Sequence, residues 1–173
     1  MELTRRDVLA ALAATGAAVG AGAVLHSELD DDSPIGSHDV ETLVAVAGVV
    51  YPSEVDGVAS FVREYSVNRV RDRPEYAAGV ADAVSELDDY AREWYDDDFA
   101  ALDADDRDRA LSGLGVDAAD PVPDGTDRER VRYYLVNELL YALFTTPTGG
   151  ELAGIENPQG YPGGTASYQR GPE

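Results

Sequence analysis

Apolar residues recur along the chain at the three- and four-residue spacing of α-helices, and this spacing predicts about five helices between residues 38 and 146. The clearest pattern runs from about Glu75 to Tyr95, where the apolar positions i, i+4, i+7, i+11 and i+14 are Val80, Val84, Leu87, Ala91 and Trp94. We expect all five side chains to face the core. No stretch alternates apolar and polar residues over the length of a β-strand, so the pattern predicts an all-α fold, a compact bundle.

Start and stop signals place the ends of the other helices. Ser37 is positioned to cap a first helix, and a second is predicted over about 56–73 with its arginines facing solvent. Either Asp103 or Asp105 can cap a fourth helix, which Gly115 closes. These signals complete the bundle up to the loop that precedes the last helix.

The last helix is the most apolar one in the chain. Thr126 with Glu129 three residues later forms a capping box that opens it. A helix that is apolar on most sides is either central or covered by a partner. Glu138 lies inside this apolar stretch, and we expect it to be the partner of an arginine rather than a catalytic acid or base.

The patterns divide the chain into four segments: a signal segment (1–25), an acidic linker (26–37), the helical domain (38–146) and a Gly/Pro-rich tail (147–173). The tail is predicted to be extended, because glycine and proline disfavour regular structure.

The amino terminus resembles a twin-arginine export signal. Its motif residues are Thr4, Arg5, Arg6, Val8 and Leu9, and an uncharged Ala/Gly-rich stretch follows. The resemblance implies that the protein folds before export and then acts outside the cytoplasm. The pattern allows either removal of the signal or its retention as an anchor.

The charge of the chain is strongly negative. The chain has thirty-four acidic and thirteen basic residues, which gives a formal net charge of −21, and all thirteen basic residues are arginine. Such a charge disfavours binding to nucleic acids and anionic membranes. Of two interpretations, a solvated surface or adaptation to concentrated salt, the complete replacement of lysine by arginine favours the second.

Few residues suited to catalysis or metal binding are present. The sequence has no cysteine, which excludes disulfides, thiolate nucleophiles and thiolate metal sites. It has two histidines, His26 and His38, for which we expect a capping or solvated role. We therefore predict no catalytic, cofactor-binding or metal-binding residue in this chain; a small hydrolase with paired carboxylates would need two buried acidic residues together.

Aromatic residues in the last helix and the tail are the predicted partner contact. They are Tyr133, Tyr141, Phe144, Ile155, Tyr161, Pro162 and Tyr168. Aromatic side chains concentrate binding energy at interfaces. The competing interpretation is that the tail folds back over this chain's own helices.

The order of motifs resembles the gluconate 2-dehydrogenase subunit 3 family. After the export signal come Tyr51-Pro52, Trp94, Phe99 with Leu102, the segment 144–147, and Gly160-Tyr161-Pro162-Gly163. The resemblance implies a non-catalytic, α-helical small subunit, exported and membrane-associated through its signal segment or its partner. By the same resemblance, this small subunit is expected to carry a flavin-dependent large subunit of the glucose–methanol–choline type, which oxidises a sugar, a sugar acid or a polyol.

The resemblance also implies where the cofactors lie: FAD in the large subunit, and haem in a third, cytochrome subunit. The alternative from another class is a stand-alone exported helical domain that binds a ligand or the cell envelope.

Overall fold

The computed structural model describes residues 35–154, and every regular element within this range is helical. The elements are α2 (Ser37–Val50), α3 (Val58–Val70), α4 (Pro74–Tyr95), η1 (Phe99–Ala101), α5 (Ala104–Leu114), η2 (Val116–Ala118), α6 (Asp127–Val131), η3 (Arg132–Asn137), α7 (Glu138–Phe144) and α8 (Pro147–Leu152). The predicted all-α class is confirmed.

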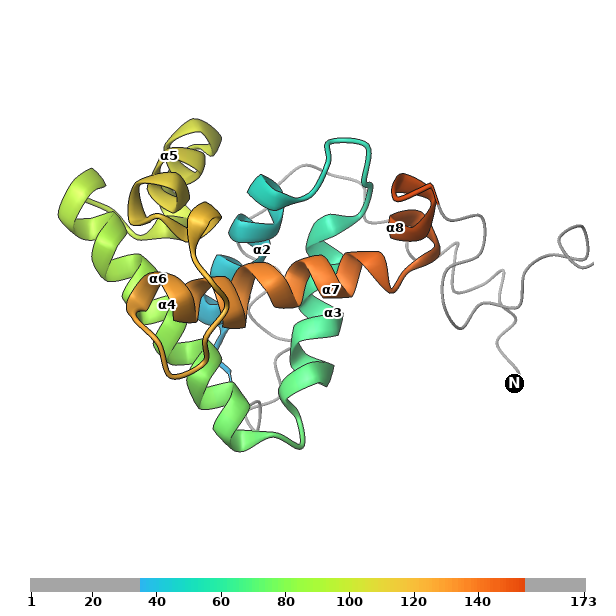
Figure 1. The fold of residues 1–173 in the computed structure, drawn as a ribbon, viewed down its shortest axis with the longest axis horizontal. Helices are drawn as coiled ribbons and strands as arrows, with labels where there is room; N and C mark the ends of the chain where they lie inside the picture. Colours follow the sequence, from blue (N-terminus) through green and yellow to red (C-terminus); the bar gives the residue numbers. More distant parts are fainter. Residues whose placement is uncertain (1–34, 155–173) are drawn as a thin grey trace, which may run out of the picture. The chain divides into compact units, whose positions relative to one another are not determined.

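Helix α2 lies at the centre of the described residues. It packs against α3, α4, α5, η1, η3 and α7, and Figure 1 shows it between α3 on one side and α4 and α5 on the other. Its buried residues are Val40, Thr42, Leu43, Ala45, Val46 and Ala47. A helix buried on several sides needs small side chains to allow close approach, and alanine and valine provide them.

Several predicted helix ends are confirmed. The side chain of Asp103 accepts a hydrogen bond from the backbone of Asp106, and Gly115 ends α5 with a φ of 81°. Thr126 and Glu129 form the predicted capping box of α6. Helix α2 is capped by Gly36 and not by Ser37, because Ser37 is already the first residue of the helix.

The prediction for Trp94 is wrong, because its side chain is 65% exposed. The chain reverses directly after α4 at Asp96, whose φ is 63°. Phe99 then returns beneath α4, is fully buried, and donates its backbone N–H to the Asp88 carboxylate. Phe99, and not Trp94, is therefore the aromatic residue buried in the core at this point, where η1 packs against α2 and α4.

The chain remains helical beyond residue 146, where the glycine content predicted an extended tail. The Thr146 hydroxyl accepts a hydrogen bond from the backbone of Gly149, and Pro147 stands at the first position of α8. Both features favour a helix start. A side chain at Gly149 would collide with the backbone carbonyl of Leu143, so its glycine lets α8 pack closely on α7.

Candidate functional site

The last helix changes its winding in the middle. Residues Arg132–Asn137 form η3, a stretch of π-helix, between the α-helical segments α6 and α7. Such π-stretches are rare and are frequent at functional sites. The stretch ends directly before Glu138, the acidic residue that the sequence placed inside the apolar helix.

The Glu138 carboxylate accepts hydrogen bonds from three side chains on two other helices. From α3, the Tyr65 hydroxyl and the Arg69 Nε both donate to Oε1, the latter at 2.5 Å, and Arg69 Nη2 donates to Oε2 at 3.2 Å. From α4, the Tyr76 hydroxyl donates to Oε2 at 2.8 Å. We call these four residues the Glu138 cluster; they tie α3, α4 and α7 together.

Electrostatics in the Glu138 cluster favour the ionised carboxylate. Burial by itself would raise the pKa of Glu138, but the hydrogen bonds from Arg69, Tyr65 and Tyr76 together outweigh burial and hold its pKa below the ordinary value. Burial, followed by the hydrogen bond to Glu138, raises the pKa of both tyrosines. The cluster is thus an ionised carboxylate that accepts hydrogen bonds from Tyr65, Arg69 and Tyr76 and so links α7 to α3 and α4.

Aromatic packing supports the cluster from the side of α4. The Arg69 guanidinium lies 5.4 Å from the centre of the Tyr76 ring, and the Tyr76 and Tyr134 ring centres are 5.4 Å apart. Gly79 makes room for Tyr134, because a side chain there would meet its ring. The prediction that Glu138 pairs with an arginine is confirmed, whereas the expectation that the arginines of α3 face solvent is wrong for Arg69.

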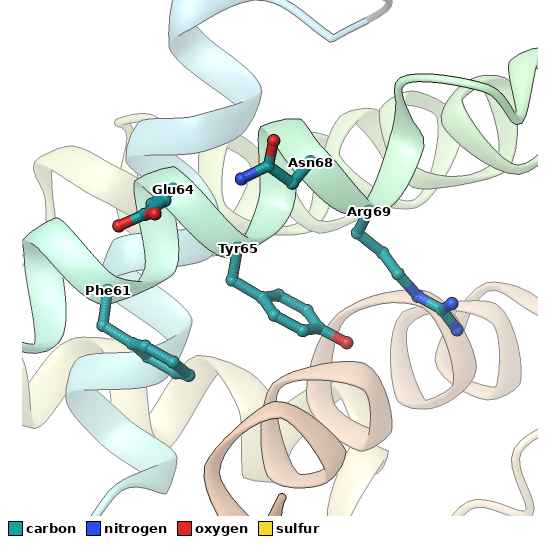
Figure 2. Close-up of a pocket in the computed structure, with 5 residues that line it drawn as sticks. All are labelled: Phe61, Glu64, Tyr65, Asn68 and Arg69. Carbon is teal, nitrogen blue, oxygen red and sulfur yellow. The ribbon is translucent and has the colours of Figure 1, made fainter. Parts of the chain in front are cut away.

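A surface groove of about 500 Å³ adjoins the cluster (Figure 2). We call it the α3 groove; its lining residues are Phe61, Glu64, Tyr65, Asn68 and Arg69. These positions recur at helical spacing and form one face of α3. Tyr65 and Arg69 point toward α7, as Figure 2 shows, and therefore belong to both the groove and the Glu138 cluster.

A second polar network joins the start of α2 to the end of α4. The Asp88 side chain is buried, accepts the backbone N–H of Phe99 at 2.9 Å, and lies 2.5 Å from Nε2 of His38. The hydrogen bond to Asp88 is the main cause that raises the pKa of His38, while burial acts in the opposite direction. His38 is half exposed, so this network is a link at the edge of the core.

The sequence interpretation missed Asp88. It lies four residues after Val84 and eight after Val80, on the apolar face of α4. An acidic residue in such a stripe is a signal of a buried, hydrogen-bonded carboxylate.

Two features are absent from the described part of the chain. Residues 35–154 contain no group of three or more His, Asp and Glu side chains arranged to hold a metal ion. In the same range no helix has the length and apolar character needed to cross a membrane.

The model of one protein family, gluconate 2-dehydrogenase subunit 3, matches residues 37–163, which is well over half of the chain. The chain belongs to the gluconate 2-dehydrogenase subunit 3 family. Comparison with curated proteins and comparison with solved structures gave no match. The family is that of a subunit of a dehydrogenase complex. The match spans the described helices from α2 to α8 and extends nine residues beyond the described range, which ends at Gly154.

The predicted contact residues of this chain are exposed, half-buried or outside the described range. Tyr141 and Phe144 are 60% and 50% exposed on α7, as an interface requires. Tyr133 is half-buried, with its ring edge-on to Tyr134 at 4.8 Å between ring centres. Outside the described residues lie the tail positions Ile155, Tyr161, Pro162 and Tyr168, the export-signal positions Thr4, Arg5, Arg6, Val8 and Leu9, and His26.

Proposed function

We propose that this chain is the non-catalytic small subunit of a flavin-dependent dehydrogenase that oxidises a sugar, a sugar acid or a polyol. In this role it binds a large subunit of the glucose–methanol–choline type, which holds the FAD, and a cytochrome subunit with haem receives the electrons. The observation that carries the proposal is the family match, which extends over all the described helices.

The exposed side chains of α7 support a binding role. Tyr141 and Phe144 are three positions apart and therefore lie on one face of the helix. Leu152 on α8, which packs against α7, adds a third exposed apolar side chain. Two aromatic residues and a leucine exposed on neighbouring helices are typical of a contact that a partner covers.

Export of the complex is the second part of the proposal. The twin-arginine motif at Arg5 and Arg6 suits a carrier that crosses the membrane together with a folded partner. The complex would then act outside the cytoplasm, associated with the membrane. Changing both arginines to lysine should leave both proteins in the cytoplasm, because lysine does not reproduce the planar guanidinium pair. Continued export of the flavoprotein would reject the carrier role.

Co-purification tests the binding role. The tagged chain, expressed with its genomic neighbours and purified in concentrated salt, should bring down a yellow flavoprotein with the absorption spectrum of FAD. Tyr141→Ser and Phe144→Ser together should weaken the complex by about 30-fold or more, the effect of losing an interface hot spot.

Trp94→Ser is the matched control, because Trp94 is an equally exposed aromatic residue on α4. It should leave the complex intact. Recovery of the wild-type chain alone would reject the proposal in favour of a stand-alone exported domain. Equal loss of the complex with Trp94→Ser would show that the contact is not on α7.

A further inference from the structure

The α3 groove has the chemistry of a peptide-binding surface. Phe61 and Tyr65 form its aromatic part, with ring centres 6.0 Å apart and an angle of 28° between the rings. Asn68 and Arg69 add hydrogen-bond donors farther along the same face of α3. Aromatic grooves of this kind bind extended segments that contain proline, since such segments are already ordered before they bind.

The described chain ends at Gly154, which is linked to the groove through α8 and α7. Gly154 follows α8, which packs against α7, and α7 is joined to the groove through the hydrogen bonds of Glu138 to Tyr65 and Arg69. Residues 155–163 can reach about 30 Å when extended, at ~3.3 Å per residue. The helix from Phe61 to Arg69 rises only about 12 Å, at 1.5 Å per residue. The segment is therefore long enough to follow the whole groove.

The sequence of residues 155–163, IENPQGYPG, fits an aromatic groove. Pro158 and Pro162 restrict its backbone and so reduce the conformational entropy that docking would cost. Tyr161 provides one large side chain for an aromatic contact. The family match also continues through residue 163 and stops before Tyr168, so this segment is part of the same match as the helices.

We propose that residues 155–163 dock into the α3 groove of the same chain, with Tyr161 against Phe61 and Tyr65. Tyr161 and Pro162 then complete this chain's own domain, which differs from their predicted place in the partner contact. Tyr168 lies beyond the docked segment in the sequence, and its place in the partner contact stays a prediction. The proposal concerns this chain alone and does not depend on the proposed function.

Disulfide cross-linking tests the proposal without competing thiols, because the chain has no cysteine of its own. The full chain carrying Asn68→Cys and Gln159→Cys should form an intramolecular disulfide, detected as a mobility shift on a non-reducing gel. The control pair is Ser112→Cys with Gln159→Cys. Ser112 is exposed on α5, which packs against α2, α4 and η1. Docking raises the effective concentration of the two thiols, so the Asn68 pair should react about tenfold faster than the control pair.

A second pair of variants tests the role of Tyr161. Tyr161→Ala, added to the Asn68 and Gln159 cysteine pair, should slow cross-linking by about tenfold, toward the rate of an undocked tail. Tyr168→Ala, the matched change outside the docked segment, should leave the rate unchanged. Equal rates for Asn68 and Ser112, or no effect of Tyr161→Ala, would overturn the proposal. Disulfide-linked dimers as the main product would also overturn it, since the tail would then occupy the groove of a second copy.

Discussion

Replacing Glu138 by glutamine keeps the shape of the side chain and removes its charge. The glutamine carbonyl can still accept from Tyr65 and from Arg69 Nε. Its amide NH₂, however, takes the place of Oε2, which accepts from Arg69 Nη2 at 3.2 Å and from Tyr76 at 2.8 Å. The Tyr76 hydroxyl can turn and accept, but the guanidinium has no acceptor. The variant therefore loses one charge-assisted hydrogen bond and leaves Arg69 without its counter-ion.

The expected loss of stability follows from these contacts. A hydrogen bond to a charged group contributes about 1.5–3 kcal/mol, and breaking a fully buried ion pair costs about 3–5 kcal/mol. The side chain of Arg69 is 28% exposed and that of Glu138 15%, so water compensates part of the loss. We expect Glu138→Gln to lower the free energy of unfolding by about 2 kcal/mol. For a chain of this length that corresponds to a melting temperature about 4–8 °C lower.

Urea unfolding followed by circular dichroism measures this difference, at one fixed salt concentration. Glu151→Gln is the control, because Glu151 is exposed on α8 and its change removes the same charge. A loss of less than about 0.5 kcal/mol relative to Glu151→Gln would refute the assignment of the Glu138 cluster as a structural tie. A double variant with Arg69→Met should lose clearly less than the two single losses together, since both changes remove the same pair.

The pH dependence of the same variant gives an independent test. The folded pKa of Glu138 is depressed below its ordinary value of 4.5, so its ionised form stabilises the fold above that pH. The advantage of the wild type over Glu138→Gln should persist above pH 4.5 and disappear as the pH falls through the lowered pKa. An advantage that stays constant into acid would contradict the ionised cluster.

Three further predictions concern other parts of the chain. His38→Gln should destabilise the protein below pH 6.5 by less than about 1 kcal/mol, because water screens the half-exposed pair of His38 and Asp88. Since the pKa of His38 is raised, the difference in stability should vanish as the pH rises through that pKa. A difference that does not change with pH would reject the ion pair between His38 and Asp88. Gly149→Ala should lower the free energy of unfolding by about 1–3 kcal/mol, since its Cβ would lie 2.1 Å from the Leu143 carbonyl oxygen. Gly48→Ala is the control: there is open space around Gly48, so this change should be neutral or stabilising in the same thermal melts. The melting temperature should fall when salt is lowered from about 1 M to 0.1 M, because the Debye length grows from ~3 to ~10 Å around a chain of charge −21; an unchanged value would refute salt adaptation.

The features predicted correctly depend on neighbours in the sequence. The cap at Asp103, the end at Gly115 and the capping box of Thr126 with Glu129 are each made within one helical turn. Their hydrogen bonds form in the local geometry of a helix end, whatever packs around it. The pairing of Glu138 with an arginine was also predictable, because a carboxylate in an apolar helix needs a counter-ion.

The identity of that arginine was not predictable from the sequence. Tyr65, Arg69 and Tyr76 lie 73, 69 and 62 residues before Glu138. No periodicity links positions so far apart, and the π-stretch before Glu138 leaves no mark in the apolar pattern. The α3 groove was not predicted either, because the spacing of Phe61 and Tyr65 along one helix does not show whether another helix covers them.

The sequence by itself determined the helical class and most of the helix ends, because apolar spacing and capping act over a few residues. It also determined the resemblance to the family, which depends on the order of motifs along the chain. Only the tertiary structure decided that Trp94 is exposed while Phe99 is buried, that α8 continues the chain as a helix, and that Asp88 lies in the core. The outcomes for Trp94, Phe99 and Asp88 depend on which side chain fills the space between helices, whereas α8 begins with a local cap and packs closely on α7 because residue 149 is glycine. Which of two side chains becomes buried is decided only when the helices pack, since a position that one residue fills and hydrogen-bonds is closed to another.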